Sequence, residues 1–111
     1  MAIRVQTGAP RQLLQAIYEA IKGDHVDTWT YDGDGDFTHS VQQWKYKAWL
    51  HPSLHDGELR LTMISRKDLS VSTEVYAIYH GRFIEMLLAH FDKSFQVAVA
   101  TAIGSLGDKL S

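Results

Sequence analysis

The chain has 111 residues, of which 45% are hydrophobic and 22% are charged, and it contains no cysteine. This length and this ordinary composition are those of one folded domain, so they exclude a mainly disordered chain and a multidomain enzyme with a separate cofactor domain. The formal net charge of −2 argues against a nucleic-acid-binding module, which usually carries a basic excess. The lack of cysteine excludes disulfides, thiolate metal sites and cysteine nucleophiles.

The sequence also carries no sign of a membrane segment or a leader. No stretch is long and apolar enough to predict a membrane-spanning helix, and residues 1–11 lack the apolar region of a secretory signal. We therefore expect a cytoplasmic protein without a membrane partner. Residues 1–111 are expected to form a single domain, with flexible ends over residues 1–9 and 105–111.

The first predicted element is an amphipathic helix over residues 10–22. Apolar residues from Leu13 to Ile21 recur at helical spacing. Pro10 suits the first helical position, and Gly23 follows the last.

Two strands separated by a turn are predicted next. Residues 26–31 are rich in β-branched and aromatic side chains, and residues 32–36 alternate aspartate and glycine as a turn does. A strand over residues 37–50 follows, but its alternation of apolar residues slips near residues 42–43. Either a β-bulge restores the alternation, or residues 37–41 belong to a separate strand.

The second half of the chain predicts two more strands and a helix. Apolar residues alternate with polar ones over residues 58–63 and 70–79, which indicates half-buried strands. Helical spacing then favours one long helix over residues 82–103. The alternative ends this helix near Asp92 and forms a further strand over residues 95–99.

These elements predict an α+β fold, a two-layer sandwich of order α-β-β-β-β-α with an antiparallel meander sheet and both helices on one face. The other face of the sheet would remain partly open. Strand alternation assigns to it the side chains of Lys45, Lys47, Trp49, Arg60, Thr62, Ile64, Tyr76 and Ile78.

The large apolar members of this open face form the predicted interface, which consists of Trp49, Ile64, Tyr76 and Ile78. Exposed apolar patches usually mark interaction sites, so the leading hypothesis is a non-enzymatic protein-interaction module that forms a homodimer or binds another protein. Stacking of nucleic-acid bases on Trp49 and Tyr76 is a further alternative, which the acidic loop of residues 32–36 disfavours.

A different class of function is a small-molecule-binding protein or a small enzyme, with a pocket between the sheet and the C-terminal helix. The candidate ligand-binding residues are His39, His51, His80 and Arg82. His80 and Arg82 stand at the predicted strand-to-helix junction, where backbone N–H groups attract anions. A cavity with a convergent histidine and arginine would favour this class, and a filled core would oppose it.

No catalytic set, metal site or cofactor is predicted. The aspartates of residues 32–36 resemble the start of a calcium-binding loop, but Gln43 stands where the loop needs its bidentate glutamate. His51 and His55 are four residues apart, but the intervening proline opposes the helix that would bring them together. We therefore expect both histidines to be solvated loop residues.

Overall fold

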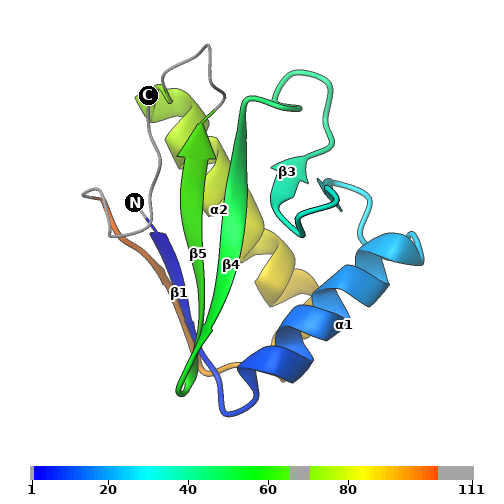
Figure 1. Cartoon of the computed structure of the whole chain (residues 1–111), viewed down its shortest axis with the longest axis vertical. Coiled ribbons are helices and arrows are strands. Elements are labelled where there is room, and N and C mark those ends of the chain that lie inside the picture. The colour runs from blue at the N-terminus through cyan, green and yellow to red at the C-terminus, as the bar shows by residue number, and fades with distance from the viewer. Residues whose placement is uncertain (1, 66–70, 103–111) are drawn as a thin grey trace.

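The computed structural model describes residues 2–65 and 71–102, which contain two helices and a six-stranded sheet (Figure 1). The predicted α+β class is confirmed. In chain order the elements are β1 (Ala2–Gln6), α1 (Pro10–Lys22), β2 (Trp29–Tyr31), β3 (Phe37–His39), β4 (Ala48–His55), β5 (Glu58–Ser65), α2 (Thr73–Phe91) and β6 (Val97–Ala100).

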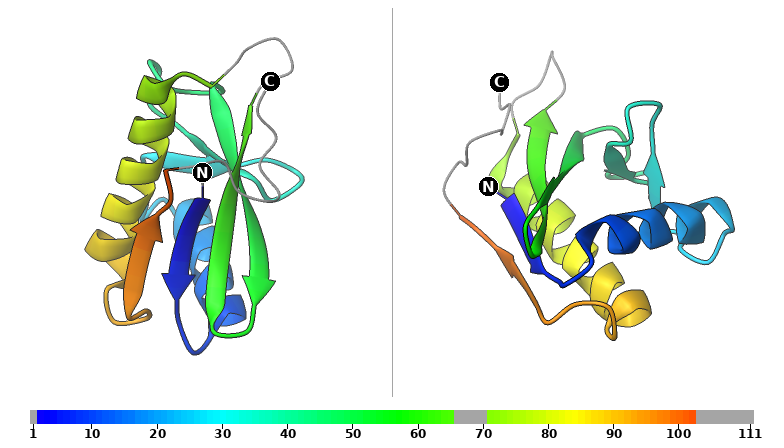
Figure 2. Two further views of the ribbon diagram at one scale, coloured as in Figure 1. Left: turned by 90° about the vertical axis from the view of Figure 1, so that its left-hand side faces the viewer. Right: turned by 60° about the horizontal axis from the view of Figure 1, so that its bottom comes forward.

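The strands follow the order β2-β3-β4-β5-β1-β6, and every neighbouring pair is antiparallel. Strands β2 to β5 form a meander, and the two terminal strands β1 and β6 extend it at the β5 edge (Figure 2). The slip in alternation near residues 42–43 marks the separation of β3 from β4, so the alternative with two strands is correct and the single strand over residues 37–50 is wrong.

Both helices pack against one face of the sheet, as predicted. The cross-strand pairs Ile3–Leu61 and Leu50–Met63 place apolar side chains on this inner face. Helix α1 lays its amphipathic stripe on them, and α2 passes behind β4 and β5 in Figure 1. The largest fully buried side chains are those of Trp29, Tyr79, Phe37, Phe83, Ile3, Ile17, Leu50, Leu59, Leu61, Met63, Leu87 and Val5.

Helix α1 has the predicted bounds. Leu13, Ile17 and Ile21 are buried at the expected spacing, and the backbone N–H of Gly23 closes the last turn on the carbonyl of Glu19 at 2.9 Å. Amphipathic spacing between two strong end signals is therefore enough to locate this element.

The predicted strand over residues 70–79 is wrong, because helix α2 begins at Thr73. The Ser72 hydroxyl caps this helix by accepting the backbone N–H of Val75 at 3.1 Å. Val75, Tyr79 and Phe83 are four residues apart, so they fit a helical stripe as well as a strand face. The flanking cap, rather than the alternation, decides the element.

The preferred long helix over residues 82–103 is also wrong, and the alternative with a strand is correct. Helix α2 ends at Phe91, and β6 follows at Val97. Strand β6 pairs with β1, near the opposite end of the chain. This long-range pairing satisfies the backbone of residues 97–100, and local periodicity gives no sign of it.

The expectation of a flexible N-terminus is wrong, because β1 lies between β5 and β6. Ile3 and Val5 are fully buried, and Arg4 and Gln6 alternate with them on the other face. This alternation is the normal signal of a half-buried strand. The other predicted flexible end, residues 105–111, lies outside the described residues.

Candidate functional site

A cavity of about 170 Å³ lies between β3, the segment of residues 40–47 and α2. Strand β3 contributes His39 to its wall, and α2 contributes Arg82 and Glu85. The remaining lining residues are Thr28, Val41 and Trp44. Two of the four residues predicted to bind a ligand, His39 and Arg82, therefore meet at one site.

His39 is the buried polar residue of this wall, with 3% of its surface exposed. Its Nδ1 accepts the backbone N–H of Val41 at 3.2 Å, which in the neutral ring places the proton on Nε2. Nε2 is shielded from solvent and has no hydrogen-bond partner in residues 2–65 and 71–102. A ligand oxygen therefore reaches this donor only when the surrounding side chains move.

The environment of His39 keeps its ring neutral. Burial lowers its pKa below the usual value, and the positive charge of Arg82 lowers it further, while Glu85 partly opposes both. A neutral ring with its proton on Nε2 is a hydrogen-bond donor toward a ligand. It is not a general base at that atom, and the lone pair on Nδ1 is already occupied.

Trp29 adds a second buried donor beside His39. Its ring centroid lies 5.0 Å from that of His39, and its Nε1 also lacks a partner within the described part of the chain. Leaving a buried N–H unsatisfied costs about 1–3 kcal/mol. Folded proteins rarely retain such groups without a water, a ligand or a function to explain them.

The rim of the cavity is charged and exposed. Nη1 of Arg82 lies 3.4 Å from both carboxylate oxygens of Glu85, which is long for an ion pair of this type. The ion pair between Arg82 and Glu85 is therefore weak, and the guanidinium of Arg82 can also bind an anion that enters the cavity.

The segment of residues 40–47 forms the opposite wall, and core residues anchor it. The Tyr79 hydroxyl donates to the carbonyl of Trp44, and the N–H of Tyr46 donates to Oγ1 of Thr38 at 3.2 Å. Tyr46 adopts a φ of 60°, which is uncommon for a bulky residue. The anchoring holds the Trp44 side chain at the cavity despite the irregular backbone.

His80 and His51, the two other predicted ligand residues, lie elsewhere. His80 is buried inside α2, where its Nδ1 is 2.9 Å from the carbonyl oxygen of Tyr76. The predicted anion site at the His80–Arg82 junction is wrong, because these residues lie within the helix and not at its N-terminus. His51 lies on β4, with Nδ1 2.6 Å from Oδ1 of Asp36.

The predicted interface is divided among three elements, the strands β4 and β5 and the helix α2. Trp49 and Ile64 are direct cross-strand partners on the outer face of the sheet, the face opposite the helices. Tyr46 stacks on Trp49 with ring centroids 6.3 Å apart. Tyr76 and Ile78 belong to α2, so their predicted place on this face is wrong.

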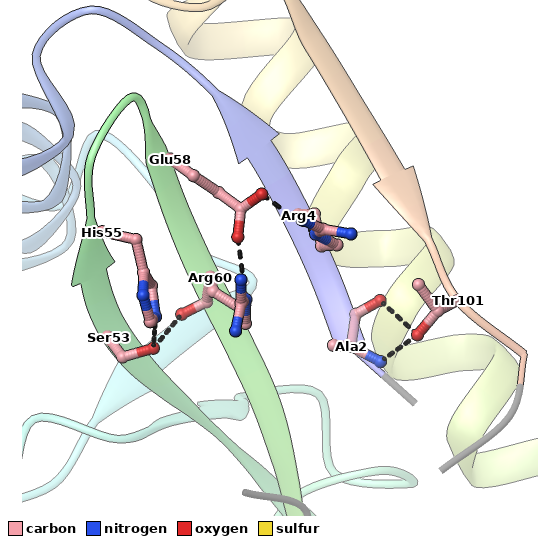
Figure 3. Close-up of polar contacts among 7 residues, drawn as sticks. All are labelled: Ala2, Arg4, Ser53, His55, Glu58, Arg60 and Thr101. Atoms are coloured by element: carbon pink, nitrogen blue, oxygen red, sulfur yellow. Dashed lines mark hydrogen bonds and ion pairs between the residues drawn. The ribbon is translucent and has the colours of Figure 1, made fainter. Parts of the chain in front are cut away.

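The same outer face carries an ion cluster of Arg4, Glu58 and Arg60 (Figure 3). Nε of Arg4 donates to one carboxylate oxygen of Glu58 at 2.9 Å, and Nε of Arg60 donates to the other at 2.7 Å. Burial alone would raise the pKa of Glu58, but the hydrogen bonds and charges of Arg60 and Arg4 outweigh it and hold the pKa below its usual range.

The acidic turn of residues 32–36 is explained by its own hydrogen bonds. Carboxylate oxygens of Asp32, Asp34 and Asp36 lie within 4.8 Å of one another. However, Oδ1 of Asp32 accepts the backbone N–H groups of Asp34 and Asp36, both at 3.0 Å. This is the geometry of an aspartate-stabilised turn, which needs no metal ion.

Sequence patterns give no sign of Thr28, Trp44 and Glu85, which lie in different segments and meet only in the fold. Comparison with protein-family models, curated proteins and solved structures finds no match for this chain. Neither α1 nor α2 has the length and apolar character needed to cross a membrane.

Proposed function

We propose that this protein binds a small anionic molecule in the cavity between β3 and α2. The observation that carries the proposal is the buried Nε2–H of His39, which lacks a protein partner in the described residues and lies in a wall shared with Arg82. A buried donor of this kind destabilises the fold by about 1–3 kcal/mol unless something accepts its hydrogen bond. An oxygen atom of a bound anion would do so.

Arg82 and His39 have distinct roles in this proposal. The guanidinium of Arg82 holds a carboxylate by its fork of N–H donors, and the neutral ring of His39 donates one further hydrogen bond. Trp44 and Val41 supply the apolar part of the wall. Because the ring of His39 already carries its proton on Nε2, we propose binding rather than acid–base catalysis.

The volume of the cavity and the charges on its wall narrow the class of ligand that it can bind. The cavity has a volume of about 170 Å³, which is small for a ligand site and favours a small ligand. The carboxylate of Glu85 would repel a simple acid, but it would accept a hydrogen bond from a ligand that also carries a donor. Short hydroxy acids and amino acids combine these two features.

The test is a titration with glycolate, glycine and acetate, observed by NMR at the indole N–H of Trp44 and the backbone of residues 38–44. We expect a saturable shift that is strongest for glycolate or glycine. The Arg82→Gln variant should bind about tenfold more weakly, because it loses a charge-assisted hydrogen bond.

Arg11→Gln, which removes an exposed arginine from α1, is the matched control and should bind as the unmodified chain does. Equal affinity in the two variants, or no saturable shift with any probe, would refute the proposal.

A second candidate is the protein-interaction module that forms a homodimer through the outer face of the sheet. The observation that favours it is the stack of half-exposed Tyr46 on Trp49, next to Ile64. Sedimentation of the protein at micromolar concentrations tests it, with Trp49→Lys as the variant expected to dissociate the dimer. A monomer in both samples would eliminate this candidate.

A further inference from the structure

We propose that the outer face of the sheet holds a second ligand site, in which Arg4 and Arg60 together bind a phosphate group. The site uses none of the residues of the cavity, so it stands or falls independently of the function proposed above. The pairing of two arginines at its centre destabilises the fold unless another group compensates their charges. Arg4 on β1 and Arg60 on β5 are direct cross-strand partners, and like charges in this position repel each other.

Glu58 holds the two arginines in place without neutralising them. Each of its carboxylate oxygens accepts one Nε–H, and only 8% of the residue is exposed. The cluster therefore has two positive charges and one negative charge. Among the outward-facing residues of β1, β4, β5 and β6, Glu58 is the one carboxylate, so no other acidic side chain of these strands compensates the excess.

The donors best suited to an anion remain available. An arginine has five N–H donors, and each of these two uses only the one on Nε within the described residues. The side chains of Arg4 and Arg60 are 49% and 30% exposed, so solvent and solutes reach them. Glu58 thus fixes both guanidinium groups through their Nε–H, and no other described residue binds their terminal N–H groups.

Neighbouring polar groups extend the site along β4. Ser53 is the cross-strand partner of Arg60, and His55 is that of Glu58. The Ser53 hydroxyl lies 2.9 Å from Nε2 of His55, and Figure 3 shows both side chains on the same face as the arginines. A hydroxyl and an imidazole N–H can each donate a hydrogen bond to a phosphate oxygen.

The geometry favours a phosphate over a carboxylate. A carboxylate has two coplanar oxygens, which match the fork of one guanidinium. An anion that contacts two guanidinium groups from neighbouring strands, on either side of Glu58, needs oxygens that point in more than one plane. A tetrahedral phosphate group has such oxygens.

The experiment uses glycerol phosphate as the probe and follows the arginine Nε–H signals by NMR, with chloride at equal ionic strength as the reference. We expect saturable shifts at Arg4 and Arg60. Arg4→Gln should weaken binding about fivefold, a discounted value for an exposed side chain, and Arg4→Lys should weaken it less. Arg11→Gln removes the same charge from α1 and should leave the affinity unchanged.

A second arm uses vesicles that contain phosphatidic acid, which present the same phosphate monoester at a membrane surface. Binding in either arm that depends on Arg4 supports the site, and the tighter arm identifies whether the source is a soluble molecule or a lipid. Shifts that chloride reproduces, or an affinity that Arg4→Gln and Arg11→Gln reduce equally, would overturn the proposal. Circular dichroism of each variant separates loss of binding from loss of the fold.

Discussion

Glu58 and His39 are two buried ionisable residues that this fold treats in opposite ways. Glu58, on β5, has both carboxylate oxygens bound by arginines, and its lowered pKa keeps it charged. His39, on β3, has one ring nitrogen bound by a backbone N–H and the other without a partner in the described chain, and its lowered pKa keeps it neutral.

The difference between them separates a structural role from a functional one. A charge that is buried with two partners joins neighbouring strands, so its removal should cost stability. A donor that is buried without a partner weakens the fold, so its retention calls for another explanation. Substitution of Glu58 should therefore lower the stability of the fold, and substitution of His39 should weaken ligand binding.

The largest expected effect is that of Glu58→Gln, which should lower the free energy of unfolding by about 2 kcal/mol. The amide is neutral and leaves Arg4 and Arg60 to repel each other across the strands; the value is discounted because both arginines are partly exposed. Urea denaturation measures the change. Glu85→Gln, at an exposed pair on α2, is the control and should change stability little. A Glu58→Gln protein as stable as the control would show that the cluster contributes nothing to the fold.

The second effect has the opposite sign. His39→Leu should leave the free energy of unfolding unchanged or raise it by up to about 1 kcal/mol, because it removes an unsatisfied buried donor. The N–H of Val41 loses its acceptor, but Val41 is 43% exposed, so water can replace the ring nitrogen. The same variant should lose binding of the small acid. A loss of stability well above 1 kcal/mol would assign His39 a structural role and remove the contrast with Glu58.

Local sequence signals predict some helices and strands correctly and others wrongly, and each outcome has a physical reason. Helix α1 was predicted with its bounds, because periodicity, Pro10 and Gly23 agree. The strand predicted over residues 70–79 is wrong because core-facing residues at every second position also contain the four-residue spacing of a helix. Residues 95–99 fit both helical spacing and the alternation of a strand, and the pairing of β6 with the distant strand β1, which decides between them, cannot be read from local sequence.

The sequence predicts the candidate site only in part, because residue types can be read from it but contacts between distant segments cannot. Histidine and arginine are distinctive residue types, so His39 and Arg82 could be selected as candidates from the sequence. Their meeting at one cavity, together with Trp44, depends on how α2 crosses the sheet beside the 40–47 segment. That His39 Nε2 has no partner among residues 2–65 and 71–102 depends on three-dimensional packing, which no spacing in the sequence encodes.

The smallest expected effect is a difference in pH dependence between the unmodified chain and His39→Leu. Because the pKa of His39 is lower in the folded state than the usual value of 6.5, the unfolded chain takes up the proton first as the pH falls. The free energy of unfolding is therefore highest above about pH 6.5 and declines below it, because burial disfavours protonation of this ring in the folded state. At pH 6 the decline cannot exceed about 0.8 kcal/mol for one histidine.

Other histidines contribute equally to both proteins, and Glu58 titrates at lower pH, so the difference between urea midpoints at pH 7.5 and pH 6 isolates His39. Identical pH dependence in both proteins would show that His39 is protonated as readily in the folded chain as in the unfolded one, so that the ring would carry a positive charge below about pH 6.5.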